Sequence, residues 1–580
     1  MTTPQEKAAA ARKAAEDAAR VAAEAMAAAE AAEQEAAASS AAAATDGESA
    51  AAGSESDTAS TESASKRPAA EPGSTGAAAK IAEGYAFSGP ALELGTVMVD
   101  GVADPDARVR IPLRMMNRHG LVAGATGTGK TKTLQGIAEQ LSRAGVPVVM
   151  ADVKGDLSGL SEPGADTEKI RARAAETGAT DWAPGTFPTE FVSLGTGGIG
   201  VPIRATITSF GPILLSKVLG LNNTQESTLG LIFHWADQRG LALLDLKDLR
   251  AVITHLTSSE GKEDLEGIGG VSGQTAGVIL RSLVNLEADG GDTFFGEPEL
   301  DPADLLRTAG GLGVITLFEL GRQAARPALF STFLMWVLAD LFQTLPEVGD
   351  IDKPKLVFIF DEAHLLFAEA SKAFLQQVEQ TVKLIRSKGV GVFFCTQLPT
   401  DIPNPVLSQL GARVQHALRA FTPDDQKALA KTVRTYPKSS VYDLEEALTS
   451  LGTGEAIVTV LSETGAPTPV AWTEVAPPRS LMDTIGEEAI KSKALSSALY
   501  GKYGQSLDRE SAYEMLLASV AAAEPAPESA PAPGRSTAQQ EEDSAAERIM
   551  ANPAVKSFLR SAASAAGREI SRSIFGTRRR

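Results

Sequence analysis

Cysteine is almost absent from this sequence of 580 residues, because Cys395 is the only one. An intramolecular disulfide is therefore excluded, as is usual for proteins of a reducing compartment. Long apolar runs are also missing. The best one, residues 333–342, is interrupted by Asp340 and predicts a core helix, not a membrane span. The N-terminus lacks the uncharged apolar segment of a secretory signal, so we expect a cytoplasmic protein.

Basic residues are outnumbered as well. The chain has 54 Lys and Arg against 73 Asp and Glu, a formal net charge of −19. This balance argues against a generally basic nucleic-acid binder. Residues 1–79 hold part of the excess, with six basic against thirteen acidic residues. A local basic pore remains compatible with the total, because the local field matters more than net charge.

Both ends of the chain have biased composition. Residues 1–79 are an Ala-rich, low-complexity tail that is helix-prone in its first half and reads as disordered in its second. Residues 516–545 are rich in Pro and Ala and predict a linker. Residues 546–580 predict a basic amphipathic helix, which could contact DNA, a membrane surface or a neighbouring subunit, or could be a solvated tail.

The region between the ends predicts an α/β fold with a mostly parallel sheet. Residues 80–118 are expected to form a short β-rich segment, and residues 119–515 the main domain. A strand–loop–helix–strand order at residues 121–151 indicates a βαβ unit. Residues 160–310 read as a mostly helical insertion. Later strands are expected at residues 314–320, 356–360 and 390–395, followed by a hairpin of residues 456–461 and 467–475.

The strongest motif is a phosphate-binding loop between a predicted strand and a predicted helix. Its glycines let successive backbone N–H groups face phosphate oxygens, and the helix N-terminus adds positive potential. Lys130 is expected to reach the β- and γ-phosphates of ATP, and the Thr131 hydroxyl to bind Mg²⁺. The predicted nucleotide-binding residues are Gly124, Ala125, Thr126, Gly127, Thr128, Gly129, Lys130, Thr131 and Thr133.

A pair of adjacent carboxylates follows the buried strand of residues 356–360. In open α/β sheets, ligands bind at the carboxyl ends of the strands. Asp361 is expected to help hold Mg²⁺. Glu362 is the candidate general base that polarises the attacking water. The alternative is a strand that simply ends in solvated acids.

Three further features are candidates for the same site. Gln397 follows another buried strand and could sense the γ-phosphate or orient water. Residues 152–156, DVKGD, follow the strand after the loop helix, and could support magnesium or nucleotide or only form a turn. Arg386 is the first choice for a cation supplied to a neighbouring subunit, ahead of Arg413 and Arg419.

These motifs resemble a known family. NRHGLVAGATGTGKT (117–131), ADVKGDLSGL (151–160), KPKLVFIFDEAHLLF (353–367) and the long segment of residues 384–426 are similar to the bacterial HerA-like ATPases, in particular the YjgR-type branch of the FtsK/HerA superfamily. The resemblance extends over residues 84–517. It implies a RecA-like P-loop NTPase core, usually hexameric, that couples ATP hydrolysis to moving along or unwinding DNA.

By motif, the resemblance maps Lys130, Thr131, Asp361, Glu362 and Gln397 onto the family's nucleotide site, and Arg386 onto the segment that supplies a trans arginine. Only about forty residues separate the tail from the loop, enough for a few strands. The large N-terminal β-barrel of classical members would not fit there, so a nuclease partner is not expected. The alternative to a DNA motor is a nucleotide-switched ATPase with a non-DNA client or an assembly role.

Overall fold

The computed structural model describes residues 74–523, except residues 153, 266–268, 289, 321–326 and 368–371. The predicted disordered tail up to residue 73, most of the predicted linker and the predicted C-terminal helix lie outside the described residues. Residues 74–79, assigned to the tail from sequence, instead belong to helix α2 (Ser74–Glu83). This helix is anchored by buried Ala78 and Ile81.

The described fold is built on one sheet of twelve strands, in the spatial order β2-β1-β14-β13-β12-β3-β11-β10-β4-β9-β5-β6. The eight strands from β12 to β6 run parallel to their neighbours, and β13, β14, β1 and β2 continue the sheet antiparallel. The strands of this sheet are β1 (Ala91–Val99), β2 (Val102–Pro112), β3 (Gly120–Ala123), β4 (Val148–Asp152), β5 (Thr189–Leu194), β6 (Val201–Ile203), β9 (Ile315–Glu319), β10 (Leu356–Phe360), β11 (Val390–Thr396), β12 (Ala412–Gln415), β13 (Glu455–Thr459) and β14 (Ala471–Val475). A separate pair, β7 (Thr308–Ala309) and β8 (Leu312–Gly313), forms a two-stranded sheet.

This topology confirms the predicted α/β class with a mostly parallel sheet. The central strands β3, β4, β9, β10 and β11 are buried at every residue. Their continuous apolar sequences are typical of strands covered on both faces. The predicted hairpin is also present, because β13 and β14 pair antiparallel with Ile457 opposite Trp472.

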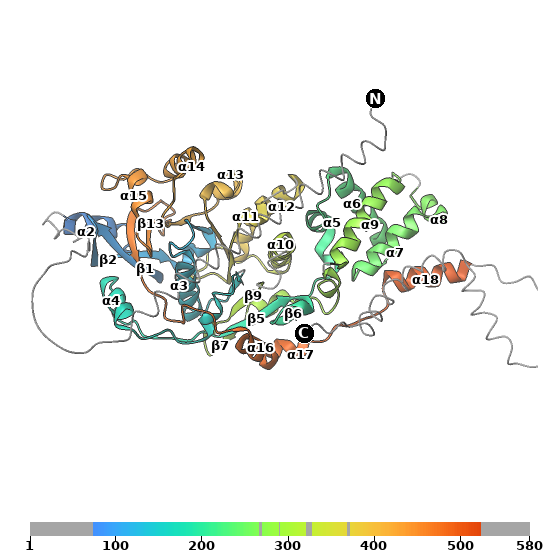
Figure 1. Cartoon of the computed structure of the whole chain (residues 1–580), viewed down its shortest axis with the longest axis horizontal. Helices are drawn as coiled ribbons and strands as arrows, with labels where there is room; N and C mark the ends of the chain where they lie inside the picture. Colours follow the sequence, from blue (N-terminus) through green and yellow to red (C-terminus); the bar gives the residue numbers. More distant parts are fainter. Residues whose placement is uncertain are drawn as a thin grey trace, which may run out of the picture. The chain divides into compact units, whose positions relative to one another are not determined.

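Residues 160–310 are less helical than the sequence suggested. They contribute β5 and β6 to the sheet, and β5 pairs in parallel with β9. Most helices of this segment, α5–α9, gather beyond the edge strand β6 in Figure 1, whereas α4 lies apart from them and contacts β2. The short β6 is followed after three residues by α5, and helix α18 packs on α7 of the same group.

Several helices begin at residues that the sequence marks as caps. Asn222 and Gln225 form a reciprocal capping box at the start of α6, as do Asp245 and Asp248 at α7. The remaining described helices are α3 (Lys130–Arg143), α4 (Glu168–Glu176), α5 (Ile207–Val218), α6 (Asn223–Gln238), α7 (Leu246–Thr257), α8 (Ser259–Glu263), α9 (Gly273–Ala288), α10 (Pro327–Thr344), α11 (His364–Phe367), α12 (Lys372–Ile385), α13 (Asn404–Leu407), α14 (Pro423–Val433), α15 (Leu444–Ser450), α16 (Glu487–Ser496), α17 (Ala498–Tyr503) and α18 (Ala512–Ala523).

Helix α10 contains the longest apolar run of the sequence. Its residues 333–338 are buried, as predicted for a core helix. Within the described ranges, no helix combines the length and apolar character needed to cross a membrane.

Candidate active site at the carboxyl edge of the sheet

The phosphate-binding loop joins β3 to α3, as the sequence predicted. Gly124, Gly127 and Gly129 have φ values of 150°, 79° and 112°, a region that side chains disfavour. Space is also limiting, because a Cβ on Gly124 would lie 2.6 Å from the Cβ of His416. The loop is held by backbone hydrogen bonds from Gly124 to Thr396 and from Ala125 to Ala417.

Lys130 is the first residue of α3 and is buried. Its Nζ donates to the carbonyl oxygens of Gly124, at 2.6 Å, and of Ala125, at 3.1 Å. Thr131 lies beside it in the first turn and is half-buried, and Gly127 at the loop tip is exposed. An ammonium at the centre of a glycine-rich loop, at a helix N-terminus, is the arrangement that a polyphosphate requires.

Thr133 has a different environment from the loop. Its hydroxyl lies 2.9 Å from Nε2 of His416, whose Nδ1 lies 2.8 Å from the carbonyl oxygen of Glu455. Burial lowers the pKa of His416 to about 4, so the ring is neutral at physiological pH. Nδ1 therefore carries the proton for Glu455, and Nε2 accepts from Thr133. The assignment of Thr133 to nucleotide binding stays a prediction.

Asp361 and Glu362 stand directly after β10. Asp361 is buried, and burial together with the neighbouring Glu362 raises its pKa. Glu362 has a left-handed backbone, with φ of 47°, and its amide donates to Oδ1 of Asp361. Such a conformation is uncommon for a residue other than glycine. A buried carboxylate beside a second acid is a suitable ligand for a divalent cation.

The side chain of Glu362 meets two basic groups. Nζ of Lys154 lies 2.8 Å from Oε1, and Nδ1 of His364 lies 3.4 Å from Oε2. Burial alone would lower the pKa of Lys154, but the hydrogen bond and the charges of Glu362, Asp361 and Asp156 outweigh it and leave that pKa raised. Lys154 is therefore a full cation next to the candidate base. Its importance was not recognised from sequence, where residues 152–156 were considered only as a group.

Gln397 follows β11, between the strands of the two main motifs. β11 pairs with β3 on one side and with β10 on the other, with Thr396 opposite Ala123 and Phe394 opposite Phe360. The Gln397 side chain is exposed at this edge. The strand end before it is fixed by Asp401, which accepts hydrogen bonds from the Thr396 hydroxyl and the Leu398 amide. The structure thus brings Gln397, the loop and the acid pair to one edge.

Two more acids lie at this edge, on strands β4 and β9. Asp152 accepts from the backbone amides of Gly155, Asp156 and Leu157, which closes the turn after β4. Burial, with Asp156 and Asp361 nearby, raises its pKa to about 6. Asp152 therefore forms a turn, and support of magnesium or nucleotide by residues 152–156 stays a prediction.

Glu319 was missed by sequence reasoning. It ends β9 directly opposite Asp152 and is only 5% exposed. Its Oε1 has no hydrogen-bond partner among the described residues. Burial first, and then Asp152, raise its pKa to about 8, so it is mostly protonated at neutral pH. A usable signal existed, because the mostly apolar strands β4 and β9 end in an acid and β10 is directly followed by one.

Arg386 is not part of this cluster. It lies in the short 3₁₀ turn η7 (Arg386–Lys388) before β11, so the length of that strand separates it from Gln397. It is exposed and lies near Arg118, whose pKa is lowered by burial and by Arg386. Of the other candidates, Arg413 donates to the carbonyl oxygens of Leu407 and Thr435, and Arg419 is exposed.

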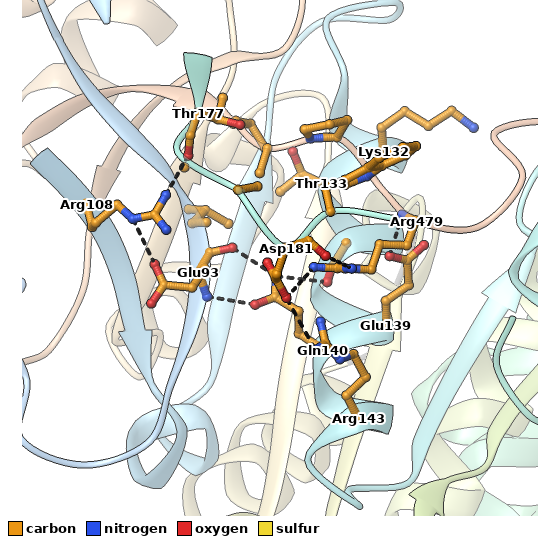
Figure 2. A pocket seen from close by; sticks show the side chains of 18 of the residues that line it. Glu93, Arg108, Lys132, Thr133, Glu139, Gln140, Arg143, Thr177, Asp181 and Arg479 are labelled. Carbon is orange, nitrogen blue, oxygen red and sulfur yellow. Dashed lines mark hydrogen bonds and ion pairs between the residues drawn. The ribbon is translucent and has the colours of Figure 1, made fainter. Parts of the chain in front are cut away.

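A cavity of about 400 Å³ runs along α3 and begins at Lys132 and Thr133 (Figure 2). Its charged side chains pair with one another or with backbone. Asp181 lies 3.6 Å from Arg143 and 2.8 Å from Arg479, and buried Glu139 accepts from the Arg479 amide. These contacts attach the segment after β14 to the helix that follows the phosphate loop. Burial raises the pKa of Glu139, opposed by its hydrogen bonds to Ser480 and Arg479.

Metal ligands beyond the motif residues are not apparent. Across the described ranges, no group of three or more His, Cys, Asp or Glu is arranged to hold a metal ion. Magnesium in P-loop proteins needs no such group, because it takes one hydroxyl and one carboxylate from the protein and the rest from phosphates and water. Thr131 and Asp361 fit that pattern.

With this geometry established, comparisons with known proteins identify the family. The family model described as helicase HerA-like C-terminal matches residues 98–580. The chain belongs to this family. The match includes the loop, the acid pair and the Gln397 strand, on which the sequence resemblance to HerA-like ATPases was based.

Curated relatives of this HerA-family chain are distant. A DNA double-strand break repair helicase HerA from Sulfurisphaera tokodaii is 23% identical over 367 residues, 63% of this chain and 66% of the relative. The protein of the same name from Sulfolobus acidocaldarius is 20% identical over 373 residues, with the same coverage. The chain thus spans slightly less than two thirds of the length of these relatives.

Solved structures with some likeness include the plasmid coupling protein TrwB in complex with a non-hydrolysable ATP analogue. It is 16% identical, with a TM-score of 0.46, over 70% of this chain and 95% of that one. VirB4 of Thermoanaerobacter pseudethanolicus is 15% identical, with a TM-score of 0.42, over 67% and 97%.

Proposed function

We propose that this HerA-family protein hydrolyses Mg-ATP as a motor, and that it works as a ring that translocates along or unwinds DNA. The observation that carries the hydrolytic part is the placement of Glu362. It lies on the strand edge shared with the phosphate loop, next to a buried Asp361. A loop for phosphates alone would support binding, whereas an added carboxylate base supports attack by water.

The residues divide the chemistry among them. Lys130 exchanges its two loop carbonyls for phosphate oxygens and neutralises charge there. Thr131 and Asp361 hold Mg²⁺, which supplies charge stabilisation to the phosphates when bound. Glu362 accepts a proton from the attacking water, and Gln397 orients that water or senses the γ-phosphate. The left-handed loop glycines support this fit, because side chains there would block the approach to phosphate.

A ring is proposed because none of the three candidate arginines reaches the acid cluster in the part of the chain that the structure describes. None of Arg386, Arg413 and Arg419 pairs with the acid cluster among the contacts of the described residues, and Arg386 lies beyond the opposite end of β11. An arginine at that position is suited to the site of a neighbouring copy, where it would stabilise charge on the transferred phosphate. A homo-hexamer is the assembly usual for HerA-like proteins.

DNA is proposed as the track on the basis of the relatives. Both curated relatives are named as DNA double-strand break repair helicases. The net charge of −19 means that any DNA contact must come from a local basic surface, such as the inner face of a ring.

The test is the ATP hydrolysis rate with no DNA, with single-stranded DNA and with double-stranded DNA, for the wild type and for Lys130→Ala. We expect hydrolysis by the wild type, stimulation by one form of DNA, and almost complete loss in the variant, since a phosphate-binding cation is removed. Hydrolysis without any DNA stimulation would support a different client. Equal rates for the two proteins would rule out this site as the source of hydrolysis.

A further inference from the structure

The loop after β4 brings Lys154 to the active site, and hydrogen bonds to Asp152 restrain this loop. Oδ1 of Asp152 accepts from the amides of Gly155, at 2.6 Å, and Asp156, at 3.2 Å, and Oδ2 accepts from Leu157 at 2.9 Å. Gly155 has φ of 76°, which completes the tight turn. Three hydrogen bonds to one buried carboxylate restrain the backbone of the three residues that follow Lys154.

The ion pair between Lys154 and Glu362 is partly shielded from water. Nζ lies 2.8 Å from Oε1, and the Glu362 side chain is 10% exposed, whereas that of Lys154 is 46% exposed. A surface pair of this kind would contribute little, but a pair with one buried partner is screened less. Glu362 has a left-handed backbone, and its carboxylate meets this loop at Lys154. The position of one carboxylate oxygen is therefore determined by a residue in the loop after another strand.

The second oxygen of Glu362 is available. Oε2 is buried and has no hydrogen-bond partner among the described residues. Nδ1 of His364 lies 3.4 Å from it, longer than a normal hydrogen bond of this type. A buried carboxylate oxygen without a donor is costly, and a water molecule is the donor that a general base needs.

We propose that Lys154 is a positioning residue that holds Oε1 of Glu362 so that Oε2 accepts the proton of the attacking water. This inference rests on the proposed ATP hydrolysis. In the step concerned, the water oxygen forms a bond to the γ-phosphorus and the bond from that phosphorus to the bridging oxygen breaks. ADP leaves with the electron pair, and the water proton passes to Oε2.

The experiment compares Lys154→Met, which keeps the length of the side chain without its charge, with Lys154→Arg, which keeps the charge. Lys262→Met, at an exposed lysine of α8, is the matched control. Steady-state hydrolysis of Mg-ATP gives kcat and KM. Binding of a fluorescent ADP analogue, with thermal unfolding, checks the site and the fold.

We expect Lys154→Met to lower kcat about 10- to 100-fold, as misplacement of a reacting group does, with analogue affinity unchanged. Lys154→Arg should recover part of the loss, and Lys262→Met should match the wild type. An unchanged kcat in Lys154→Met would overturn the inference. A higher kcat would overturn it as well, because it would show that Lys154 restrains Glu362. If Lys154→Met does not fold, Lys154→Arg still tests the inference. Its guanidinium group would not occupy the position of the lysine ammonium group, so kcat should still be lower than in the wild type.

Single-turnover hydrolysis in a Glu362→Gln background separates this role from a direct one. If Lys154 acts only through Glu362, the double variant should match Glu362→Gln within about twofold, since coupled residues are not additive. A further large loss in the double variant would place Lys154 on phosphate or magnesium and overturn the inference. An inactive wild type would instead refute the proposed function itself.

Discussion

Two pairs of carboxylates lie on neighbouring strand ends of the same sheet edge and differ in what surrounds them. Asp361 and Glu362 follow β10, and Asp152 and Glu319 end β4 and β9. Burial raises a pKa in both pairs, that of Asp361 in the first and those of Asp152 and Glu319 in the second. Burial and residue type alone therefore do not separate a reactive acid from a structural one.

The partners make the distinction. Both oxygens of Asp152 are occupied by backbone amides, and Glu319 faces that carboxylate with no cation among its described contacts. Among the described residues, Glu362 has Lys154 on one oxygen and no hydrogen-bond donor on the other. A carboxylate oxygen without a donor is open to a water molecule, whereas a protonated carboxyl group, or a carboxylate whose two oxygens both hold backbone amides, is less suited to receive one. The first pair is thus suited to chemistry and the second to architecture.

The largest expected effect comes from Glu362→Gln. We expect kcat for ATP hydrolysis to fall about 10²- to 10⁴-fold, because the amide cannot take the proton of the water. The affinity for nucleotide should stay close to that of the wild type, since Gln keeps the volume of the side chain. Steady-state and single-turnover hydrolysis, with binding of a fluorescent ADP analogue, provide the measurements.

Glu319→Gln is the matched control, because it makes the same chemical change at the same sheet edge. Its kcat should remain within a few-fold of the wild type. If both substitutions cost the same in kcat, the distinction between the two pairs fails. If neither changes kcat, the base is elsewhere.

The second effect is on stability and its pH dependence. The pKa of Glu319 is raised from 4.5 to about 8, so the folded state favours its protonated form. The contribution of this raised pKa to the free energy of unfolding is fully present below about pH 4.5. It is lost as pH rises from there through 8, by at most about 1.4 kcal/mol per pH unit. Relative to the wild type, Glu319→Gln should therefore be increasingly stabilised between pH 5 and pH 8.

Thermal unfolding of the two proteins at several pH values measures this difference. Asp152 titrates in the same range, with its pKa raised to about 6, but it is present in both proteins. The difference between them therefore reports mainly on Glu319. A gap that is constant with pH would mean that Glu319 has an ordinary pKa and a counter-charge.

Local sequence was sufficient for the parts of the site that lie on single strands. The expected strand at residues 356–360 is observed as β10 with the same bounds, and the helix predicted after the phosphate-binding loop is observed as α3. An apolar strand that ends in Asp-Glu, or in a glycine-rich loop with Lys-Thr, carries its own signal. The predicted α/β fold was correct for the same reason.

What could not be predicted depends on distant contacts. Strand β6 has three residues and follows a Gly-rich stretch, so nothing local distinguishes it from a loop, and β5 is placed by its pairing with β9 more than a hundred residues later. The pairing of Lys154 with Glu362 likewise depends on the left-handed turn after β10. Only the folded chain shows which of several acids receives the cation.

The smallest effect extends the comparison to two threonines of α3. Thr131 is half-buried beside Lys130, whereas the Thr133 hydroxyl donates to the neutral ring of His416. Thr133→Val leaves Nε2 of that ring without a donor and should cost about 1 kcal/mol of unfolding free energy, with KM for ATP changed less than about twofold.

Thr131→Val makes the same change two residues earlier and should instead abolish most magnesium-dependent hydrolysis while unfolding near the wild-type temperature. Chemical denaturation and steady-state kinetics distinguish the two. A higher KM for Thr133→Val at unchanged stability would return Thr133 to the nucleotide site, where the sequence placed it, and would show that its contact with His416 is exchanged when ATP binds.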